Sequence, residues 1–295
     1  MTTMTTASTA TGGFAIGFRR GWSPWQRDLE PLVRWAHDNA FAAVDLGNDA
    51  DVAGPKVIAA GGRIGSVDLA EWRGMISADP AIRKAAVEKN KAYVERCAEF
   101  GALIHFVVML PEDPAKPPGE NFRFMVESFR ELAPAMERVN AKLVIEGWPG
   151  PGALCCNPEG YRAFFDECPS PAMGVNYDPS HLIRMGIDPI RFLREFSGRG
   201  YHVHGKDTEI IPEAVYEFGW SLPPILAKGH GFGSTFWRYT IPGHGVTRWG
   251  EAFRILKAGG YSGLVCIELE DENFNGTEEG EKRGLILSRD FLRGV

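Results

Sequence analysis

The sequence predicts an α/β fold, a (β/α)8 barrel of parallel strands, in a chain of 295 residues. Short runs of β-branched or apolar residues alternate with amphipathic segments of helical length, which is the pattern of repeated βα units. No shift in composition and no linker rich in proline, glycine or serine divides the chain. Acidic or histidine residues also stand at the carboxyl ends of four of the runs, which is where such barrels do their chemistry.

The elements can be assigned in chain order. Strands are predicted near residues 13–18, 42–46, 63–68, 103–109, 142–147, 173–178, 200–205 and 263–268. Helices are predicted near residues 25–39, 53–61, 79–101, 120–140, 157–168, 188–196, 247–259 and 276–292. Asp79-Pro80 and Asp188-Pro189 place a capping carboxylate before a proline in the first helical turn, and Gly101 stands where the third helix should end.

One stretch, residues 207–246, interrupts the regular alternation, and we predict a long irregular loop there between barrel strands seven and eight. Its aromatic residues are Tyr216, Phe218, Trp220, Phe232, Phe236, Trp237 and Tyr239. An aromatic loop over the barrel mouth would exclude water and stack on the faces of a sugar. The alternative is a loop that packs on itself or on a neighbouring subunit.

The remaining chain is predicted as one catalytic domain over residues 12–295. Residues 1–11 contain no charged side chain and no apolar core, so we expect a disordered tail rather than a signal peptide. The five cysteines form an odd number without CxxC spacing, which is typical of a reducing compartment. Together these features predict a cytoplasmic protein.

The overall composition disfavours two classes of partner. With 44% hydrophobic and 24% charged residues, the chain has the balance of a globular protein with a large core. The net charge of -6 and the absence of a basic block disfavour nucleic acid, because phosphate binding needs a basic face. The longest apolar runs, such as residues 106–110, are the size of a strand, so no membrane span is expected.

The four residues at the strand ends are Glu146, Asp178, His204 and Glu268. If each points inward, the four side chains converge on the barrel mouth. Carboxylates buried close together are costly unless a cation neutralises them, so the set predicts a divalent metal site. Oxygen and nitrogen donors suit Mn²⁺, with Mg²⁺, Co²⁺ or Zn²⁺ as alternatives, and do not suit a soft thiolate site. Any one of these residues alone would be read as part of a salt bridge at a strand end.

Three further residues lie close to these strand ends in the sequence. His181 follows Asp178 by three residues. It is a candidate for binding the substrate, for supporting the metal ligands, for binding the metal as an alternative ligand, or for capping a helix. Lys206 could neutralise an alkoxide or hold a sugar hydroxyl, and the alternative is a surface salt bridge. Trp148 is placed either to wall the pocket or to pack in the core.

The other histidines and the long loop give weaker indications. His202 is expected one layer deeper in the barrel than the predicted histidine ligand, as a core or supporting residue. His105 lies inside a predicted strand, and we expect a buried histidine with its hydrogen bonds satisfied. Arg238 and His244 lie on the long loop, and Arg238 is the candidate we predict to bind the substrate.

The strings Asn176-Tyr-Asp-Pro-Ser-His-Leu, His202-Val-His-Gly-Lys-Asp207 and Ile267-Glu-Leu-Glu-Asp271 resemble the sugar phosphate isomerase/epimerase family. Members of that family have the xylose isomerase-like TIM barrel. The order Glu, Asp, His, Glu is similar to that of the ketose 3-epimerases, and separations of 32 and 26 residues fit one βα unit each. The resemblance covers residues 140–271 and is only architectural before them.

This resemblance implies that the four strand-end residues are the metal ligands. In epimerase-like members the two glutamates, here Glu146 and Glu268, also move protons on opposite faces of the bound sugar. His181 and Lys206 match positions that contact the substrate. Two departures stand out: 64 residues separate His204 from Glu268, and the first half of the chain lacks the substrate residues of the epimerases.

The predicted chemistry is removal of a proton next to a carbonyl through an enediolate, by a divalent-metal-dependent sugar isomerase or epimerase. Glu146 and Glu268 are predicted as the catalytic pair. Returning the proton to the opposite face gives epimerisation, and returning it to the neighbouring carbon gives isomerisation. The alternative is a lyase or dehydratase, in which the same enediolate expels a β-leaving group, as in the inosose dehydratases and C-glycoside deglycosidases that the chain resembles.

Two other functions fit the sequence less well. Phosphodiester-cleaving endonucleases on a similar barrel use several metals and a basic surface, whereas this acidic chain has seven histidines in all. A binding protein without activity would be expected to have lost one of the four ligands. The expected partner is therefore a small-molecule sugar or glycoside, in a homo-oligomer or in a hetero-complex with a small subunit.

Overall fold

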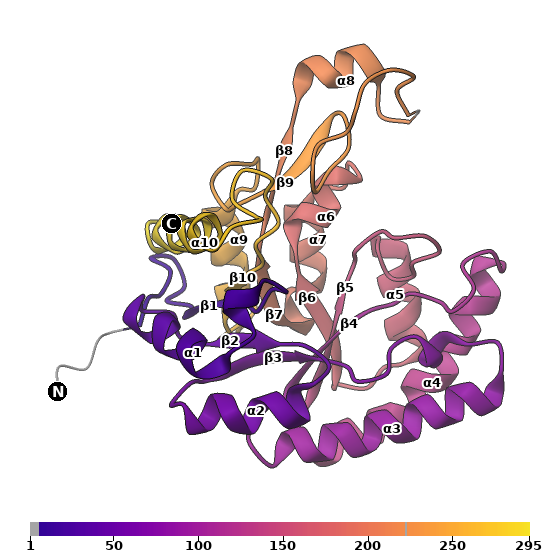
Figure 1. The fold of residues 1–295 in the computed structure, drawn as a ribbon. Helices are drawn as coiled ribbons and strands as arrows, with labels where there is room; N and C mark the ends of the chain where they lie inside the picture. The colour runs from indigo at the N-terminus through magenta and orange to yellow at the C-terminus, as the bar shows by residue number, and fades with distance from the viewer. Residues whose placement is uncertain (1–5, 222) are drawn as a thin grey trace.

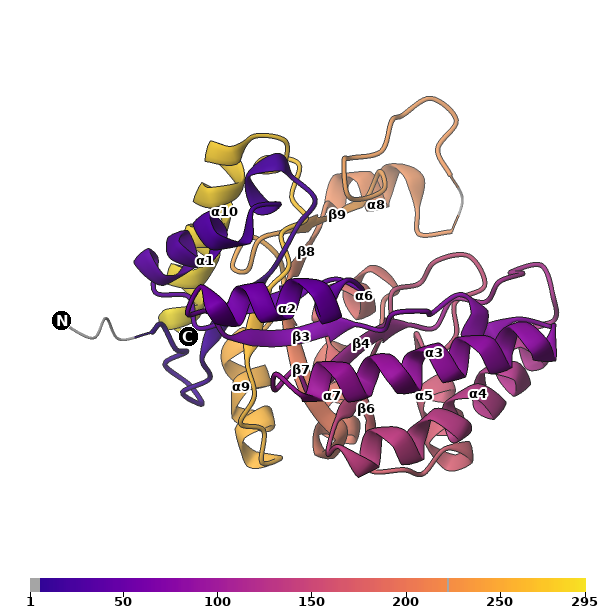
Figure 2. The same ribbon diagram turned by 60° about the horizontal axis from the view of Figure 1, so that its bottom comes forward.

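The computed structural model describes residues 6–221 and 223–295. Its barrel strands are β1 (Ile16–Arg19), β2 (Val44–Leu46), β3 (Ile64–Asp68), β4 (Ile104–Val108), β5 (Lys142–Glu146), β6 (Met173–Tyr177), β7 (Gly200–Gly205) and β10 (Val265–Ile267). Each strand pairs in parallel with its neighbours, and β10 closes the barrel against β1. The helices lie outside the barrel, between successive strands (Figures 1 and 2). The predicted TIM barrel is therefore confirmed.

Two of the helices start where the sequence places capping carboxylates. The helices of the barrel are α1 (Leu29–Asp38), α2 (Ala50–Ala59), α3 (Pro80–Ala98), α4 (Pro118–Arg138), α5 (Pro158–Glu167), α6 (Pro179–Arg184), α7 (Pro189–Phe196), α9 (Trp249–Ala258) and α10 (Glu278–Arg293). Asp79 accepts a hydrogen bond from the Ala81 amide across 2.7 Å, and Asp188 caps α7 in the same way. The short helix α6, directly after β6, was not predicted from the sequence.

Alternation along the strands separates the barrel interior from the layer of helices. On β4, the ring of Phe106 stacks on the His204 ring across the interior, at 5.2 Å between centroids. The preceding residue, His105, points the other way and meets Tyr93 of α3. A Cβ atom added to Gly65 would lie 2.2 Å from a carboxylate oxygen of Asp45, so glycine there makes room for a buried acid inside the barrel.

The insertion over residues 207–246 lies between barrel strands seven and eight as predicted, but it is not irregular throughout. β8 (Asp207–Ile210) and β9 (Trp237–Thr240) form an antiparallel hairpin that carries α8 (Pro212–Phe218). We call residues 207–240 the arm, and Figure 1 shows it rising away from the barrel. Two strands of four residues, separated by 26 residues, give too short an alternation to be read from the sequence.

The predicted disordered tail over residues 1–11 is also wrong in part. The Ala7 amide bonds to the carbonyl of Ala40 across 2.7 Å, and the Ala7 carbonyl accepts from the Ile16 amide. Ala7 and Thr9 are both buried. Backbone pairing orders this segment without any need for charged or large apolar side chains. Residues 1–5 of the predicted tail lie outside the described residues.

The structure also describes the cysteines and the helices that bear on the predicted cellular compartment. All five cysteines are free and buried. Burial raises the pKa of the adjacent thiols Cys155 and Cys156, so neither has the lowered pKa of a reactive thiol. Within the described ranges, no helix is both long and apolar enough to cross a membrane.

His105 corrects another expectation, because it is fully buried and neither ring nitrogen has a hydrogen-bond partner among the described residues. Burial lowers the pKa of His105 to about 3. The folded state therefore excludes a proton that the unfolded chain takes up near its ordinary pKa of 6.5. Stability should be lost as the pH falls from 6.5 towards 3, by about 2 kcal/mol between pH 7 and pH 5.

We predict that His105→Met removes this part of the pH dependence and raises the free energy of unfolding at pH 5 by about 2 kcal/mol or more. Denaturant unfolding at pH 7 and pH 5 measures both effects. His37→Gln, at an exposed histidine, is the matched control and should behave like the wild type. An unchanged pH dependence in His105→Met would contradict the prediction.

Candidate metal centre and active site

The four predicted ligands come together at the carboxyl ends of the barrel strands. Glu146 is the last residue of β5, Asp178 follows β6, His204 lies in β7 and Glu268 follows β10. One ligand atom from each lies within 4.8 Å of all the others. Three of the side chains are buried and Glu268 is half-buried, so the cluster is closed on the barrel side and open towards the mouth.

The two oxygens of the Asp178 carboxylate have different roles, one in capping a helix and one in the cluster. Oδ1 accepts hydrogen bonds from the amide of Ser180 at 2.9 Å and from its hydroxyl at 2.6 Å, which starts helix α6. Oδ2 is buried and faces the cluster without a hydrogen-bond partner among the described residues. The same cap places His181 on the first turns of α6, against the Glu146 carboxylate at 3.2 Å.

Lys206 lies inside the cluster rather than in a surface salt bridge. It is 1% exposed, and its Nζ atom lies 2.5 Å from Glu268 Oε2, 3.0 Å from Glu270 Oε2 and 3.3 Å from Asp178 Oδ2. Burial alone would lower the pKa of Lys206, but the surrounding carboxylates raise it well above its ordinary value. The lysine therefore carries a permanent positive charge into a site rich in acids.

The charges of the ligands are also fixed by their neighbours. Burial opposes ionisation of Glu146, yet the positive charge of His204 and a hydrogen bond to His181 hold the pKa of Glu146 below its usual range. Burial likewise opposes ionisation of Glu268, and Lys206, His204 and Arg19 outweigh it and lower the pKa of Glu268. Both glutamates are consequently carboxylates near neutral pH, which is the form that binds a metal or accepts a proton.

The donor atoms fit a divalent cation. His204 Nδ1 lies 2.6 Å from Glu146 Oε2 and 3.5 Å from Glu268 Oε2. These short distances are not hydrogen bonds, because the angles do not suit one. Neither His204 nitrogen nor Asp178 Oδ2 has a hydrogen-bond partner among the described residues, although all three atoms are buried. Three carboxylates and one imidazole are the mixed oxygen and nitrogen donors that Mn²⁺, Mg²⁺, Co²⁺ and Zn²⁺ accept. These residues could hold one such ion.

Sequence reasoning missed a pair of residues that supports Glu268. Arg19, at the end of β1, binds both carboxylate oxygens of Asp68, at the end of β3, across 2.8 and 2.9 Å. Its Nε atom lies 3.2 Å from Glu268 Oε1, and its guanidinium lies over the Phe106 ring at 4.7 Å. The rule that polar residues at strand ends face the mouth could have found both Arg19 and Asp68.

We predict that Arg19→Lys weakens metal binding by about 10-fold, because lysine keeps the charge but cannot bind Asp68 with two parallel bonds while holding Glu268. Calorimetric titration with Mn²⁺ measures this change directly. Arg20→Lys is the matched control, since Arg20 pairs instead with Asp49 at the surface. Equal affinities for the wild type and Arg19→Lys would show that Arg19 does not position Glu268.

Deeper in the barrel, Asp45 and His202 form a second buried cluster beside His204. Asp45 of β2 accepts from the Ser66 amide at 2.6 Å and lies 2.8 Å from His202 Nε2. The same carboxylate lies 3.8 Å from His204 Nε2. His202 is therefore a supporting core residue, as the sequence indicates. Asp45 had no clear signal, because an acid inside a strand of three residues is usually exposed.

In the described part of the chain, no hydrogen bond or ion pair joins the two remaining predicted substrate residues to the four ligands. Trp148 is half-buried and folds its ring over Gly150 in the loop after β5. Arg238 lies on β9, where it bonds to Glu209 at 2.7 Å and to Asp271 at 3.1 Å. These bonds tie the arm to the loop after β10. The structure therefore does not bring Arg238 to the metal ligands.

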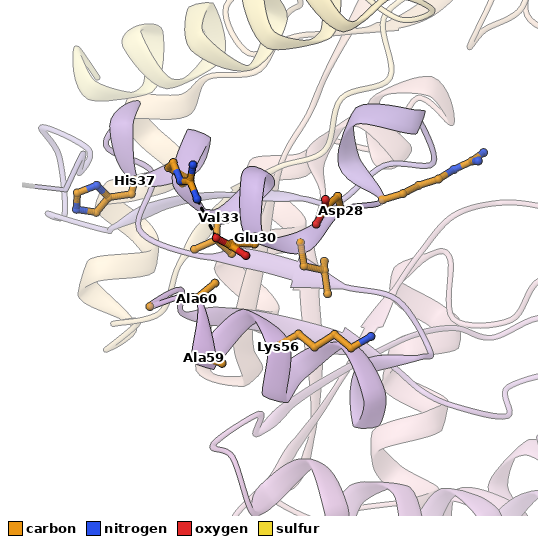
Figure 3. Close-up of a pocket in the computed structure, with 11 residues that line it drawn as sticks. Asp28, Glu30, Val33, His37, Lys56, Ala59 and Ala60 are labelled. Carbon is orange, nitrogen blue, oxygen red and sulfur yellow. Dashed lines mark hydrogen bonds and ion pairs between the residues drawn. The ribbon is translucent and has the colours of Figure 1, made fainter.

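Two surface cavities differ in their relation to the cluster. A cavity of about 490 Å³ includes Glu268 and Glu270 in its wall, together with Arg19, Trp22 and Phe232. A larger cavity of about 1000 Å³ lies outside the barrel between α1 and α2 (Figure 3). None of the four ligands lines the larger cavity, and its charged groups are exposed ones such as Glu30 and Arg34. Size alone therefore does not identify the active site.

The fold and the cluster together define a barrel protein with a candidate metal site at its mouth. A model of the family described as xylose isomerase-like TIM barrel matches residues 24–294. The chain belongs to this family, which confirms the resemblance seen in the sequence.

Curated relatives match a part of the chain. An uncharacterized protein, YfiH, of Bacillus subtilis (strain 168) is 36% identical over 108 residues, which are 34% of this chain and 32% of that protein. An inosose dehydratase of Geobacillus thermodenitrificans (strain NG80-2) is 30% identical over 154 residues, which are 52% of this chain and 48% of the dehydratase. The matches thus span about a third to a half of the length of these relatives.

Solved structures match nearly the whole chain. The 3-keto-D-glucoside 4-epimerase of E. coli superimposes with a TM-score of 0.68 at 14% identity, covering 93% of this chain and 98% of that one. A D-psicose 3-epimerase of Clostridium cellulolyticum H10 gives a TM-score of 0.67 at 16% identity, covering 94% and 98%. At such identities these likenesses establish the fold alone.

Proposed function

We propose that this protein is a divalent-metal-dependent isomerase or epimerase that moves a proton next to the carbonyl of a sugar. The observation that carries the proposal is the convergence of Glu146, Asp178, His204 and Glu268 within 4.8 Å at the barrel mouth. Two epimerases share the fold, and inosose dehydratases match part of the chain. Their names refer to a 3-keto-D-glucoside, to D-psicose and to inosose.

The proposed mechanism assigns a role to each residue of the cluster. A bound Mn²⁺, or alternatively Mg²⁺, Co²⁺ or Zn²⁺, would supply Lewis-acid stabilisation of the negative charge that develops on the substrate oxygens. Glu146 and Glu268 are the proton-moving pair, since both are held as carboxylates. Lys206 and His181 orient the substrate oxygens by hydrogen bonds from Nζ and from the imidazole.

The cavity beside Glu268 is the proposed substrate pocket. Its volume of about 490 Å³ lies within the range of small-molecule sites. Trp22 and Phe232 stand on its wall, 82% and 41% exposed, and offer aromatic faces to a sugar ring or to an attached group. Phe232 belongs to the arm, so the returning part of the arm reaches the mouth while α8 stays clear of it.

A lyase or dehydratase remains the second candidate function. Lys206 favours it, because a buried ammonium 2.5 Å from the proposed base Glu268 could hydrogen-bond a departing oxygen and stabilise its negative charge while that oxygen takes up the proton that Glu268 has removed. The matched segments of inosose dehydratases also favour it. In this alternative, the same glutamate removes the proton and a β-substituent leaves in place of reprotonation.

Proton NMR in D₂O separates the two functions. The Mn²⁺-loaded enzyme would be incubated with ketohexoses, inososes and 3-keto-glucosides, and the metal removed before spectra are recorded. Deuterium entering a carbon next to the carbonyl without loss of a group supports the isomerase or epimerase. Release of water or of an aglycone supports the lyase. No exchange and no release with any of the substrates would contradict both.

We also propose that the protein self-associates and acts in the cytoplasm. α8 has no buried residue, and Tyr216, Ile225 and Leu226 are 86%, 97% and 92% exposed near the tip of the arm. Such an apolar tip supports a homo-oligomer or a complex with a small subunit. Light scattering after size-exclusion chromatography tests it, and a monomer at micromolar concentration would contradict the homo-oligomer.

A further inference from the structure

A chain of hydrogen bonds leads from the arm into the candidate active site. Tyr239 lies on β9, is 4% exposed, and its hydroxyl lies 2.7 Å from His181 Nδ1. Arg184 of α6 donates from Nη1 to the same hydroxyl across 2.7 Å. On the other side of the imidazole, His181 Nε2 lies 3.2 Å from Glu146 Oε1. The chain therefore joins Arg184, Tyr239, His181 and Glu146 in that order.

The direction of these bonds is fixed at the arginine. A guanidinium has only donors, so the Tyr239 oxygen accepts from Arg184. The tyrosine hydrogen then needs an acceptor, and His181 Nδ1 is the other hydrogen-bond partner of this hydroxyl in the described part of the chain. Burial raises the pKa of Tyr239, so the hydroxyl keeps its hydrogen. His181 Nδ1 is accordingly the acceptor, and its ring proton lies on Nε2.

The surroundings of Nε2 agree with this assignment. With a proton on Nε2, the contact with Glu146 Oε1 is a hydrogen bond, whereas without one two lone pairs would face each other at 3.2 Å. Lys206 Nζ also lies 3.3 Å from His181 Nε2. Two of its hydrogens are donated to Glu268 and Glu270, which lie 2.5 and 3.0 Å away, and the third need not be donated to His181 because Asp178 Oδ2 lies at the same distance of 3.3 Å.

The arm holds Tyr239 firmly in place. The Lys206 ammonium lies over the tyrosine ring at 4.6 Å, and the Arg184 guanidinium lies over the neighbouring Trp237 ring at 4.5 Å. Arg238, between the two aromatic residues, anchors β9 to Asp271. The base of the arm is thus packed against the site, in contrast to its exposed tip.

We infer that Tyr239 is a positioning residue, supplied by the arm, that donates to His181 Nδ1 and so holds the ring with its Nε2–H aimed into the active site. In the protein without substrate, that hydrogen is bonded to Glu146. It becomes available to a substrate oxygen when the Glu146 carboxylate binds the metal or accepts a proton. The assignment of a substrate oxygen rests on the proposed function, whereas the tautomer does not. The insertion between β7 and β10 is therefore a part of the active site.

The test combines the imidazole tautomer with kinetics. In histidine-labelled wild-type protein, ¹⁵N NMR should show the His181 Nδ1 unprotonated and Nε2 protonated. Tyr239→Phe keeps the ring but removes the hydroxyl, so the His181 resonances should shift towards a mixture of the two tautomers. In the D₂O exchange reaction kcat should fall about 10-fold, with KM changed much less. Tyr216→Phe, at the exposed tip of the arm, is the matched control.

Arg184 provides a second, independent variant. Arg184→Gln should shift the tautomer in the same direction, and Arg184→Lys should restore it in part, because a lysine can still donate to the Tyr239 hydroxyl. Protonated His181 Nδ1 in the wild type, or an unchanged tautomer and kcat in Tyr239→Phe, would overturn the inference. The expected tautomer in a protein that exchanges no substrate proton would support this inference and contradict the proposed function instead.

Discussion

Replacing Glu268 with glutamine is expected to lower proton exchange by at least 10²-fold, because the neutral amide cannot accept the proton next to the carbonyl. The same change removes one negative charge from the four-ligand cluster, so binding of Mn²⁺ should also weaken. Exchange into substrate in D₂O and calorimetric titration with Mn²⁺ measure the two effects separately. Assays at saturating Mn²⁺ distinguish lost chemistry from lost metal.

The control for this variant is Glu272→Gln. Glu272 lies four residues later in the same loop, is exposed, and pairs with His230 at 2.8 Å rather than with any of the four ligands. It should retain exchange and metal affinity. Full turnover by Glu268→Gln at saturating metal would show that Glu268 is not one of the proton-moving pair.

Replacing Lys206 with methionine is expected to lower the free energy of unfolding of the metal-free protein by about 3–5 kcal/mol. Lys206 is 1% exposed, and its ammonium lies within 3.3 Å of three carboxylates. Methionine has a similar length but leaves these acids without their buried cation. Denaturant unfolding in the presence of a chelator measures the loss.

Added metal should then reverse part of this loss. A cation bound only by the folded state at 100 times its dissociation constant stabilises a protein by about 2.7 kcal/mol. The gain should be greater for Lys206→Met than for the wild type, because the variant has no ammonium to repel the ion. Lys257→Met, at an exposed lysine of α9, serves as the control. Equal gains in both proteins would contradict the electrostatic role given to Lys206.

The barrel and its four candidate ligands could be predicted because both follow from local patterns. Alternating apolar runs and capped helices identify the βα units, and polar residues at the ends of parallel strands meet at one mouth. Glu146, Asp178, His204 and Glu268 each satisfy this rule on their own strand. Arg19 and Asp68 satisfy it too, and were missed only because no acid-and-histidine pattern drew attention to β1 and β3.

Other features depend on contacts that are distant in sequence. Tyr239 meets His181 across 58 positions of the chain, and neither residue alone indicates the other. The arm is built from two strands too short to show a period, and the ordered part of the tail depends on backbone bonds to Ala40. His105 looked like a satisfied core histidine, because a sequence gives no count of hydrogen-bond partners.

The central claim is that the four strand-end residues hold one divalent cation at the mouth of the barrel. Anomalous diffraction from crystals soaked in Mn²⁺ tests this claim most directly. The account predicts one strong peak about 2.0–2.6 Å from donor atoms of Glu146, Asp178, His204 and Glu268, with Lys206 displaced from among their carboxylates. No peak at these residues, or a peak bound by Asp45 and His202 alone, would contradict it.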